Sequence, residues 1–189
     1  MLNKSTIQQW TIQAMAMRSY PDKRFPPSRY YRFLRIAAQN MQPKLSVELG
    51  VCGGGGSLHL AMGWAGGRVV GVDIEIEKQY EERIAYIEDK HLNFTLRIGD
   101  SVQSAKYITD HYGNVDILFI DTTHTYEQTM AEYNAWLPYM SDNSIICFDD
   151  LLRPGMEQVW DELPEPKLRL DHLHDGAENG GGFGVIWNE

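Results

Sequence analysis

The 189-residue sequence predicts an α/β protein in which helices cover both faces of a doubly wound, mostly parallel sheet. The first observation behind this prediction is alternation: short apolar runs and longer segments of helical spacing follow one another from residue 45 to residue 148. The second is that a glycine or an aspartate directly follows each of the five apolar runs in this region. These residues lie at the carboxyl ends of the predicted strands. Open parallel sheets bind ligands at that edge, so a ligand site is expected there.

Two helices are expected before the first strand. Residues 3–18 carry apolar side chains at mixed helical spacing, and residues 29–41 follow a proline-containing loop, with Ser28 in the N-cap position. We therefore predict that residues 1–43 form a helical segment that covers the sheet or forms part of the wall of a substrate site. Residues 44–189 are predicted to form the main domain, within one compact unit overall.

Charge is distributed unevenly along the chain. The net charge is −9, whereas residues 1–44 hold eight Lys or Arg against Asp22 alone and so carry +7. This basic segment is expected to cover an acidic body or to meet an anionic ligand, and the acidic total argues against nucleic-acid binding. Cationic and aromatic side chains also lie close together in its loop: Arg24, Phe25, Arg29 and Tyr30. They favour an anionic or ring-bearing small molecule as partner.

Membrane and secretion signals are not evident in the sequence. No apolar run reaches the roughly 18 residues of a membrane span, and the polar first ten residues do not resemble a signal peptide. We expect a cytoplasmic protein with no membrane partner, and homo-oligomer formation is left open. Cys52 and Cys147 lie far apart without further cysteines or histidines at ligand spacing, so they are expected to be reduced, buried thiols.

The loop after the first strand predicts a nucleoside site. The strand ends at Gly50, glycines occupy positions 53 to 56, and Ser57 opens a helix. Glycine lets a ligand approach the main chain, and a helix start offers unpaired N–H groups. The second strand delivers Asp73, whose carboxylate can accept both hydroxyls of a ribose. Cys52 stands where the dinucleotide pattern requires glycine, and no G-K-S/T follows, which excludes a P-loop.

The pattern that remains is Glu48-x-Gly50-x-x-Gly53-Gly54 followed by Asp73. It resembles motif I and the acidic residue of class I S-adenosylmethionine (SAM) dependent methyltransferases. The resemblance implies SAM as cofactor and a Rossmann-like, seven-stranded sheet that closes with a C-terminal antiparallel hairpin. The alternative is a glycine-rich turn in some other α/β protein.

The same resemblance implies a set of cofactor-binding residues at the strand ends. They are Glu48, Gly50, Cys52, Gly53, Gly54, Ser57, Asp73, Ile74, Asp100, Ser101 and Asp121. Asp100 and Ser101 follow the third strand, where they could hydrogen-bond the adenine amino group. Asp100 would otherwise be a helix N-cap, and both roles are compatible.

The remaining elements are assigned from spacing and turn residues. Strands are predicted at residues 45–49, 68–72, 94–98, 115–120, 144–148, around 168–170 and at 183–187. After the helix that opens at Ser57, helices are predicted at residues 75–90, 102–111, 126–139 and 155–163, and a turn at residues 140–143. The last two strands form the expected hairpin.

Three carboxylates are expected to converge at the carboxyl edge of the sheet. The fourth strand delivers Asp121 and the fifth delivers Asp149 and Asp150. Such charges repel one another unless a cation lies among them, and oxygen ligands favour Mg²⁺, with Mn²⁺ or Ca²⁺ behind it. The spacing of 28 residues between the strand-end aspartates resembles the metal site of the catechol O-methyltransferase-like group. Asp150 is alternatively a helix cap.

Residues 120–127, I-D-T-T-H-T-Y-E, resemble the IDG-x-H-x-Y-E segment of a bacterial subgroup. This subgroup, methyltransferase family 24-like, includes macrocin-type sugar O-methyltransferases and cephalosporin-hydroxylase-like proteins. The resemblance implies that His124 is the general base and that Asp121 is catalytic, whereas Thr122 departs from the usual glycine. The alternative for His124 is a loop histidine that caps a helix or bonds a carboxylate.

These features predict a SAM-dependent, metal-assisted O-methyltransferase that acts on a hydroxyl of a small molecule, such as a sugar or a natural-product ring. Coordination lowers the pKa of an alcohol, and a neutral imidazole can take its proton. A same-fold N-methyltransferase and a non-catalytic SAM-binding partner protein are the alternatives. Among the other histidines, His59 is expected to be packed. His172 and His174 are expected in a solvated loop, although such a pair could bind metal on a strand.

Overall fold

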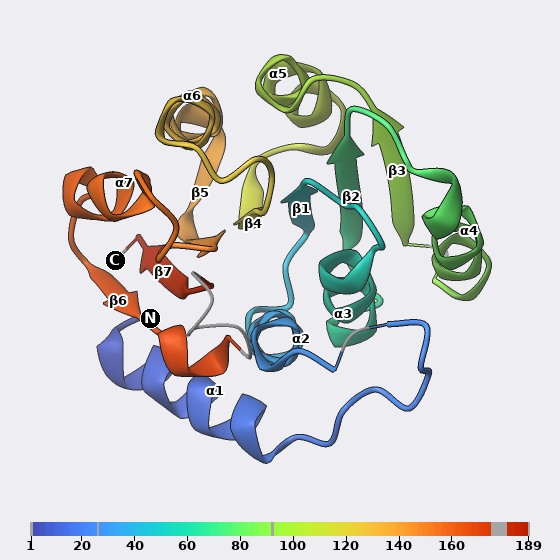
Figure 1. Cartoon of the computed structure of the whole chain (residues 1–189), viewed down its shortest axis with the longest axis horizontal. Helices are drawn as coiled ribbons and strands as arrows, with labels where there is room; N and C mark the ends of the chain where they lie inside the picture. The colour runs from blue at the N-terminus through green and yellow to red at the C-terminus, as the bar shows by residue number, and fades with distance from the viewer. Residues whose placement is uncertain (1, 26, 92, 175–180, 189) are drawn as a thin grey trace.

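A seven-stranded sheet forms the centre of the molecule in the computed structural model, which describes residues 2–25, 27–91, 93–174 and 181–188. The strand order is β3-β2-β1-β4-β5-β7-β6 (Figure 1). The strands are β1 (Leu45–Leu49), β2 (Arg68–Asp73), β3 (Phe94–Ile98), β4 (Val115–Ile120), β5 (Met140–Asp149), β6 (Lys167–Arg169) and β7 (Phe183–Trp187). β1 to β5 pair in parallel, and β7 lies antiparallel between β5 and β6. The predicted fold class, including the closing hairpin, is confirmed.

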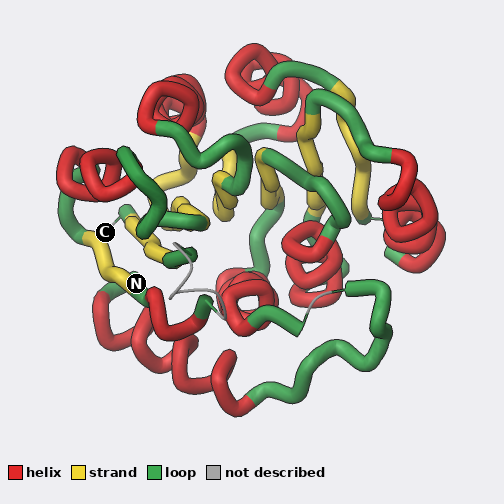
Figure 2. Tube along the Cα trace, viewed as in Figure 1, coloured by secondary structure: helices red, strands yellow, loops and turns green. Residues whose placement is uncertain are grey.

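Helices cover both faces of the sheet (Figure 2). One face packs against α1 (Lys4–Ala16), α2 (Arg29–Met41), α3 (Gly55–Gly63) and α4 (Glu81–Lys90). The other packs against α5 (Ser101–Tyr112), α6 (Tyr126–Trp136) and α7 (Met156–Glu162). Three short 3₁₀ helices complete the described chain: η1 (Lys78–Tyr80), η2 (Leu137–Tyr139) and η3 (Asp171–Leu173). None of the helices in the described ranges is both long and apolar enough to span a bilayer.

The last four residues of β4, Ile117 to Ile120, are all apolar and do not alternate with polar residues. Ile117 and Phe119 pack into the core beneath α1 to α4, whereas Leu118 and Ile120 pack into the core beneath α5 to α7. Central parallel strands are buried on both faces and therefore read as continuous apolar runs.

β1 and β4 mark the point where the strand order reverses. β1 pairs with β2 on one side and β4 on the other. The chain leaves β1 for α3 on one face of the sheet and leaves β4 for α6 on the opposite face. The two connections diverge, and such a reversal opens a crevice at the carboxyl ends of the strands. The fold therefore places a ligand site beside Gly50 and Asp121.

The N-terminal helices share a core with the sheet. Ile7 and Trp10 of α1, Phe33 of α2 and Phe183 of β7 are all buried in one apolar cluster. α2 also packs closely on α3, since a Cβ at Gly63 would lie 2.7 Å from the carbonyl oxygen of Arg35. This packing brings the start of α2 toward the carboxyl edge of the sheet.

Three predicted boundaries were wrong. The helix predicted from residue 75 begins only with η1 and α4, because the Asp73 carboxylate accepts a hydrogen bond from the Glu75 N–H and competes with helical pairing. The turn predicted at 140–143 belongs to β5, whose Met140 pairs with Val115. α3 begins at Gly55, two residues before the predicted start.

The two cysteines differ in exposure. Cys147 is buried, as predicted, but Cys52 is exposed. Cys52 belongs to the loop between β1 and α3, at the carboxyl ends of the strands. The prediction of a buried thiol at Cys52 was therefore wrong.

Candidate functional site

A pocket of about 260 Å³ lies at the carboxyl ends of the central strands. It contains five of the predicted cofactor residues: Gly50, Asp73, Ile74, Asp100 and Ser101. Its other lining residues are Val72, Gly99, Thr122, Thr123 and Gln128. Six predicted residues are not among the described residues that line it: Glu48, Cys52, Gly53, Gly54, Ser57 and Asp121. A larger cavity, about 450 Å³, lies toward the start of β5 and holds none of the predicted site residues.

Asp73 holds the glycine loop against the end of β2. Its Oδ2 accepts a hydrogen bond of 2.8 Å from the Cys52 N–H. Gly50 has a φ of +84°, and a Cβ there would lie 2.0 Å from the carbonyl oxygen of Asp121. Only glycine fits this close approach between the loop after β1 and the end of β4. Gly50, which lines the pocket, therefore packs directly against the backbone of Asp121.

Glu48 lies behind the loop and supports it. Its buried carboxylate accepts a 2.7 Å hydrogen bond from the Ser57 N–H and a further bond from the Ser57 hydroxyl, at the start of α3. Burial raises the pKa of Glu48 to about 8, although the bonds from Ser57 act in the opposite direction. Glu48 and Ser57 thus fix the helix start instead of facing the pocket.

A buried carboxylate that the sequence analysis missed organises the other side of the pocket. Glu132 of α6 accepts hydrogen bonds from Ser101 Oγ (2.5 Å), Thr122 Oγ1 (2.9 Å) and Gln128 Nε2 (2.8 Å). These three donors all belong to the pocket lining, and burial raises the pKa of Glu132. Asp100 lines the pocket and also caps α5 by accepting from the Gln103 N–H. The predicted N-cap is confirmed, and the contact with adenine stays a prediction.

Beside the pocket, acids and imidazoles converge as the sequence predicted for Asp121, Asp149 and Asp150. His124 Nε2 lies 3.7 Å from Asp121 Oδ1 and 3.4 Å from Asp150 Oδ2. Burial, followed by the charge of Asp149, raises the pKa of Asp121 well above its usual range. Burial and neighbouring negative charges both disfavour ionised carboxylates, so a cation among these acids would stabilise their charged forms.

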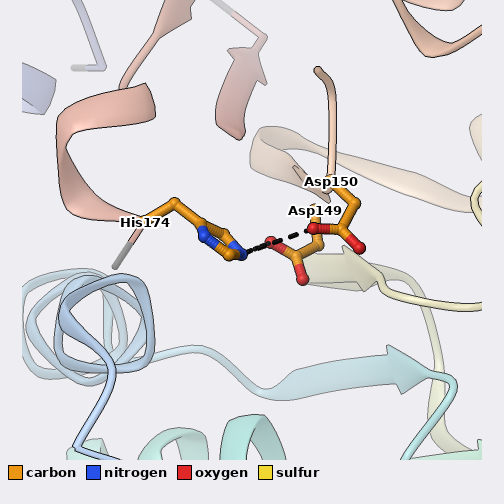
Figure 3. Close-up of side chains that lie close together, drawn as sticks. All are labelled: Asp149, Asp150 and His174. Carbon is orange, nitrogen blue, oxygen red and sulfur yellow. Dashed lines mark ion pairs between the residues drawn. The ribbon is translucent and has the colours of Figure 1, made fainter. Parts of the chain in front are cut away.

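A second histidine joins the cluster from the C-terminal region. His174 Nε2 lies 3.4 Å from Asp149 Oδ1 and 3.4 Å from Asp150 Oδ1. Figure 3 shows the His174 ring pointing at both carboxylates. Ligand atoms of Asp149, Asp150 and His174 all lie within 4.8 Å of one another, a spacing at which they could hold a metal ion. Asp121 lies outside this closest group.

His124 and Asp150 have backbones in the left-handed region, with φ of +52° and +53°. Such conformations are uncommon outside glycine and persist where the surrounding structure imposes them, often at functional sites. Neither residue caps a helix, because Thr125 is the N-cap of α6 and Gly155 that of α7. The helix-cap alternatives for both residues were therefore wrong. The other alternative for His124, a loop histidine that bonds a carboxylate, agrees with its position beside Asp121 and Asp150 and stays open.

A family model described as a methyltransferase domain matches residues 47–151, just over half of the chain. The chain belongs to this family. The match confirms the predicted resemblance to class I SAM-dependent methyltransferases, and it runs from within β1 to just past Asp150.

Solved structures of several methyltransferases have the same fold as this chain. They include the O-methyltransferase from Bacillus cereus in complex with SAH (20% identity, 100% of this chain and 93% of that chain covered, TM-score 0.69). The O-methyltransferase TomG from Streptomyces achromogenes, involved in tomaymycin synthesis and solved with SAM, is similar over 100% of both chains (14% identity, TM-score 0.68). The match to the SAH-bound methyltransferase PaMTH1 from Podospora anserina covers 100% of this chain and 89% of that chain (13% identity, TM-score 0.65).

One relative was found by sequence. It is the uncharacterized protein y4gI of Sinorhizobium fredii, 33% identical over 67 residues. The aligned part covers 32% of this chain and only 7% of that protein.

His172 and His174 were predicted to lie together in a solvated loop. His172 is exposed, as predicted, but the prediction was wrong for His174, whose side chain is only 14% exposed. The reason is the packing of η3: Leu173 is fully buried, and the Phe183 N–H donates to the Asp171 carboxylate from β7. The anchored turn brings His174 to the acid cluster.

The first turn of α2 also reaches the candidate site. The Tyr30 ring stacks on His174 at 4.9 Å and 5°, and the Tyr31 ring lies where a side chain at Gly55 would be. Arg24, by contrast, pairs with Asp22 and lies over Tyr86 of α4, 4.1 Å from the ring centroid. The cationic and aromatic residues that are close in sequence therefore separate in space.

Proposed function

We propose that this protein is a SAM-dependent O-methyltransferase that uses a divalent cation to methylate a hydroxyl group of a small molecule. The observation that carries the proposal is the contact between two sites. A pocket that contains Asp73 and Asp100 adjoins, across Gly50, the cluster of Asp121, Asp149, Asp150 and His124. A methyl donor and an acceptor need this adjacency.

The pocket has the groups that a nucleoside needs. Within the described part of the chain, Asp73 Oδ1 accepts only a long hydrogen bond, 3.4 Å, from the Glu75 N–H, and so retains capacity to accept ribose hydroxyls. Asp100 and Ser101 lie on the side proposed for adenine, where Glu132 orients the Ser101 hydroxyl. SAM would supply the transferable methyl group on its sulfonium.

The acid cluster fits a divalent cation. Asp149 is 4% exposed, and its Oδ1 has no hydrogen-bond partner among the residues that the structure describes. Buried carboxylate oxygens rarely lack a partner, and this one faces the group that converges within 4.8 Å. Asp149 and Asp150 would hold the ion, with Asp121 alongside. When bound, the cation would lower the pKa of a coordinated hydroxyl.

His124 is the proposed general base. Its Nε2 faces Asp121 and Asp150, so this nitrogen is directed at the place where a hydroxyl held by the cluster would lie. Burial lowers the pKa of His124, although the charge of Asp150 opposes the shift. The lowered pKa keeps the imidazole neutral and able to accept a proton near neutral pH. The charge of Asp150 would then stabilise the imidazolium that forms.

Two observations support a hydroxyl acceptor. The site offers carboxylates and an imidazole of lowered pKa, which suit the deprotonation of an alcohol. The structurally similar proteins from Bacillus cereus and Streptomyces achromogenes are O-methyltransferases. Tyr30 and Tyr31 would form the wall of the acceptor site, because α2 presents both rings at the cluster.

The proposal is tested by measuring SAM binding and SAH formation with and without EDTA. With a panel of sugar and phenolic acceptors and added Mn²⁺ or Mg²⁺, we expect SAH formation that EDTA abolishes, while calorimetric SAM affinity stays the same. Transfer to amines alone, or transfer that persists in EDTA, would contradict the metal-assisted O-methylation. SAM binding without turnover on any acceptor would favour a non-catalytic binding protein.

The Asp73→Ala variant is expected to bind SAM more weakly by about 1 to 3 kcal/mol, roughly 5- to 150-fold in Kd. The substitution removes the acceptor for the ribose hydroxyls and frees the Cys52 N–H. Titration calorimetry measures the change, and Glu75→Ala, which alters an exposed neighbouring acid, is the matched control. Equal SAM affinities in the two variants would remove Asp73 from the cofactor site.

A further inference from the structure

We propose that His174 is a nitrogen ligand of the cation site and that it makes the site prefer a first-row transition ion such as Mn²⁺ over Mg²⁺. This inference rests on the cation site of the proposed function and changes the expected ion. The predicted ligands were carboxylates alone, for which Mg²⁺ came first. The geometry adds an imidazole from a segment that the family match, residues 47–151, does not reach.

Distances in the cluster suit direct coordination. Ligands about 2.1 Å from an octahedral ion lie about 3 Å apart when adjacent and about 4 Å apart when opposite. His174 Nε2 lies 3.4 Å from both Asp149 Oδ1 and Asp150 Oδ1. These separations exceed a good N–H···O hydrogen bond, and Asp149 Oδ1 has no hydrogen-bond partner in the described parts of the chain. A small adjustment around an ion would bring all three atoms to coordination distance.

The two carboxylate oxygens of Asp150 face different histidines: the proposed metal ligand His174 and the proposed base His124. Oδ1 faces His174, whereas Oδ2 lies 2.5 Å from Arg153 Nε and 3.4 Å from His124 Nε2. The Arg153 guanidinium therefore holds the oxygen that points away from His174. This division leaves Oδ1 for the ion and keeps His124 on the other side of the carboxylate, where it serves as the base.

The position of His174 is supported on two sides. Its ring stacks nearly parallel on Tyr30, and the preceding Leu173 is fully buried. Tyr30 comes from α2 and the acids come from the end of β5, so three separate segments build the site. A supported imidazole is typical of a ligand that must keep its orientation toward a metal.

Ligand chemistry decides which ion such a site takes. Mg²⁺ prefers oxygen ligands and keeps several waters, whereas imidazole nitrogen suits transition ions, whose affinities exceed that of Mg²⁺ at mixed sites. Two carboxylates and one imidazole therefore favour Mn²⁺ or Fe²⁺. Replacing His174 leaves a carboxylate site and should remove most of that preference.

The test is Mn²⁺ binding to the chelator-treated whole chain, followed by electron paramagnetic resonance and competition with Mg²⁺. We expect Mn²⁺ to bind at least about 10-fold more tightly than Mg²⁺. In His174→Ala, Mn²⁺ affinity should fall by about 10-fold or more while Mg²⁺ affinity changes much less. Spin-echo modulation from a coordinated nitrogen should be present in the wild type and lost in this variant. His172→Ala, two residues away and exposed, should behave as the wild type.

The possible failures are distinguishable. Mn²⁺ binding that His174→Ala leaves unchanged, with the nitrogen signal unaltered, would overturn the ligand assignment and leave the proposed function standing. Loss of Mn²⁺ and Mg²⁺ binding to the same extent would mean that His174 only supports the acids, and would also overturn it. A wild-type protein that binds neither ion would overturn both this inference and the metal-assisted mechanism. SAM affinity, measured on each variant, confirms that the fold is retained.

Discussion

The His124→Asn variant is expected to transfer methyl groups at least about 100-fold more slowly than the wild type, because a positioned base contributes roughly 10²- to 10⁴-fold. Asparagine is the informative replacement. His124 has a φ of +52°, and asparagine tolerates this left-handed backbone better than most residues. The variant therefore removes the imidazole without forcing the loop after β4 to move.

Steady-state kinetics at saturating SAM measure this effect, and SAM affinity serves as the check on the fold. His124 is not among the residues lining the pocket proposed for SAM, so its loss should leave SAM binding nearly unchanged. His172→Asn, at an exposed position, is the matched control. If His124→Asn retained normal kcat, His124 would be a structural partner of Asp150 and the base would have to be sought elsewhere in the cluster.

The parts of the site that were predictable lie where the sequence leaves little freedom. Strand periodicity located the ends of β1, β2 and β4, and in a parallel sheet these ends meet at one edge. Asp73 and Asp121 were therefore placed correctly without knowledge of any long-range contact. The same reasoning brought Asp121 beside Asp149, since β4 and β5 pair in parallel with Ile120 opposite Phe148.

The parts that were missed depend on contacts between segments remote in sequence. His174 reaches the acids only because Leu173 buries itself and β7 returns beside β5. Glu132 occupies one position on a helix of mixed polarity, and its partner Ser101 is 31 residues away. Neither residue has a local pattern that distinguishes it from an ordinary surface residue of its type. His172 and His174 both adjoin the buried Leu173, yet one is exposed and the other is not, so a histidine next to a buried leucine is compatible with both environments.

The Glu48→Gln variant is expected to lose less stability than the wild type as the pH rises from 5 to 8. Burial raises the pKa of Glu48 to about 8, well above the value near 4.5 expected in the unfolded chain. Between these values the folded state holds a proton that the unfolded state has released, so the free energy of unfolding falls as the pH rises. Each pH unit in this window costs about 1.4 kcal/mol, or about 3 to 4 kcal/mol from pH 5 to 8.

Glutamine resembles the protonated carboxyl in shape and cannot ionise, so it removes this contribution while its carbonyl still accepts from the Ser57 N–H. Denaturant unfolding at pH 5, 6, 7 and 8 measures the difference between the two proteins. Glu88→Gln, at an exposed position of α4, should follow the wild type at every pH. A difference between Glu48→Gln and the wild type that stays constant over this range would show that Glu48 is already ionised in the folded protein at pH 5. In that case the hydrogen bonds from Ser57, and not burial, would dominate its environment behind the glycine loop.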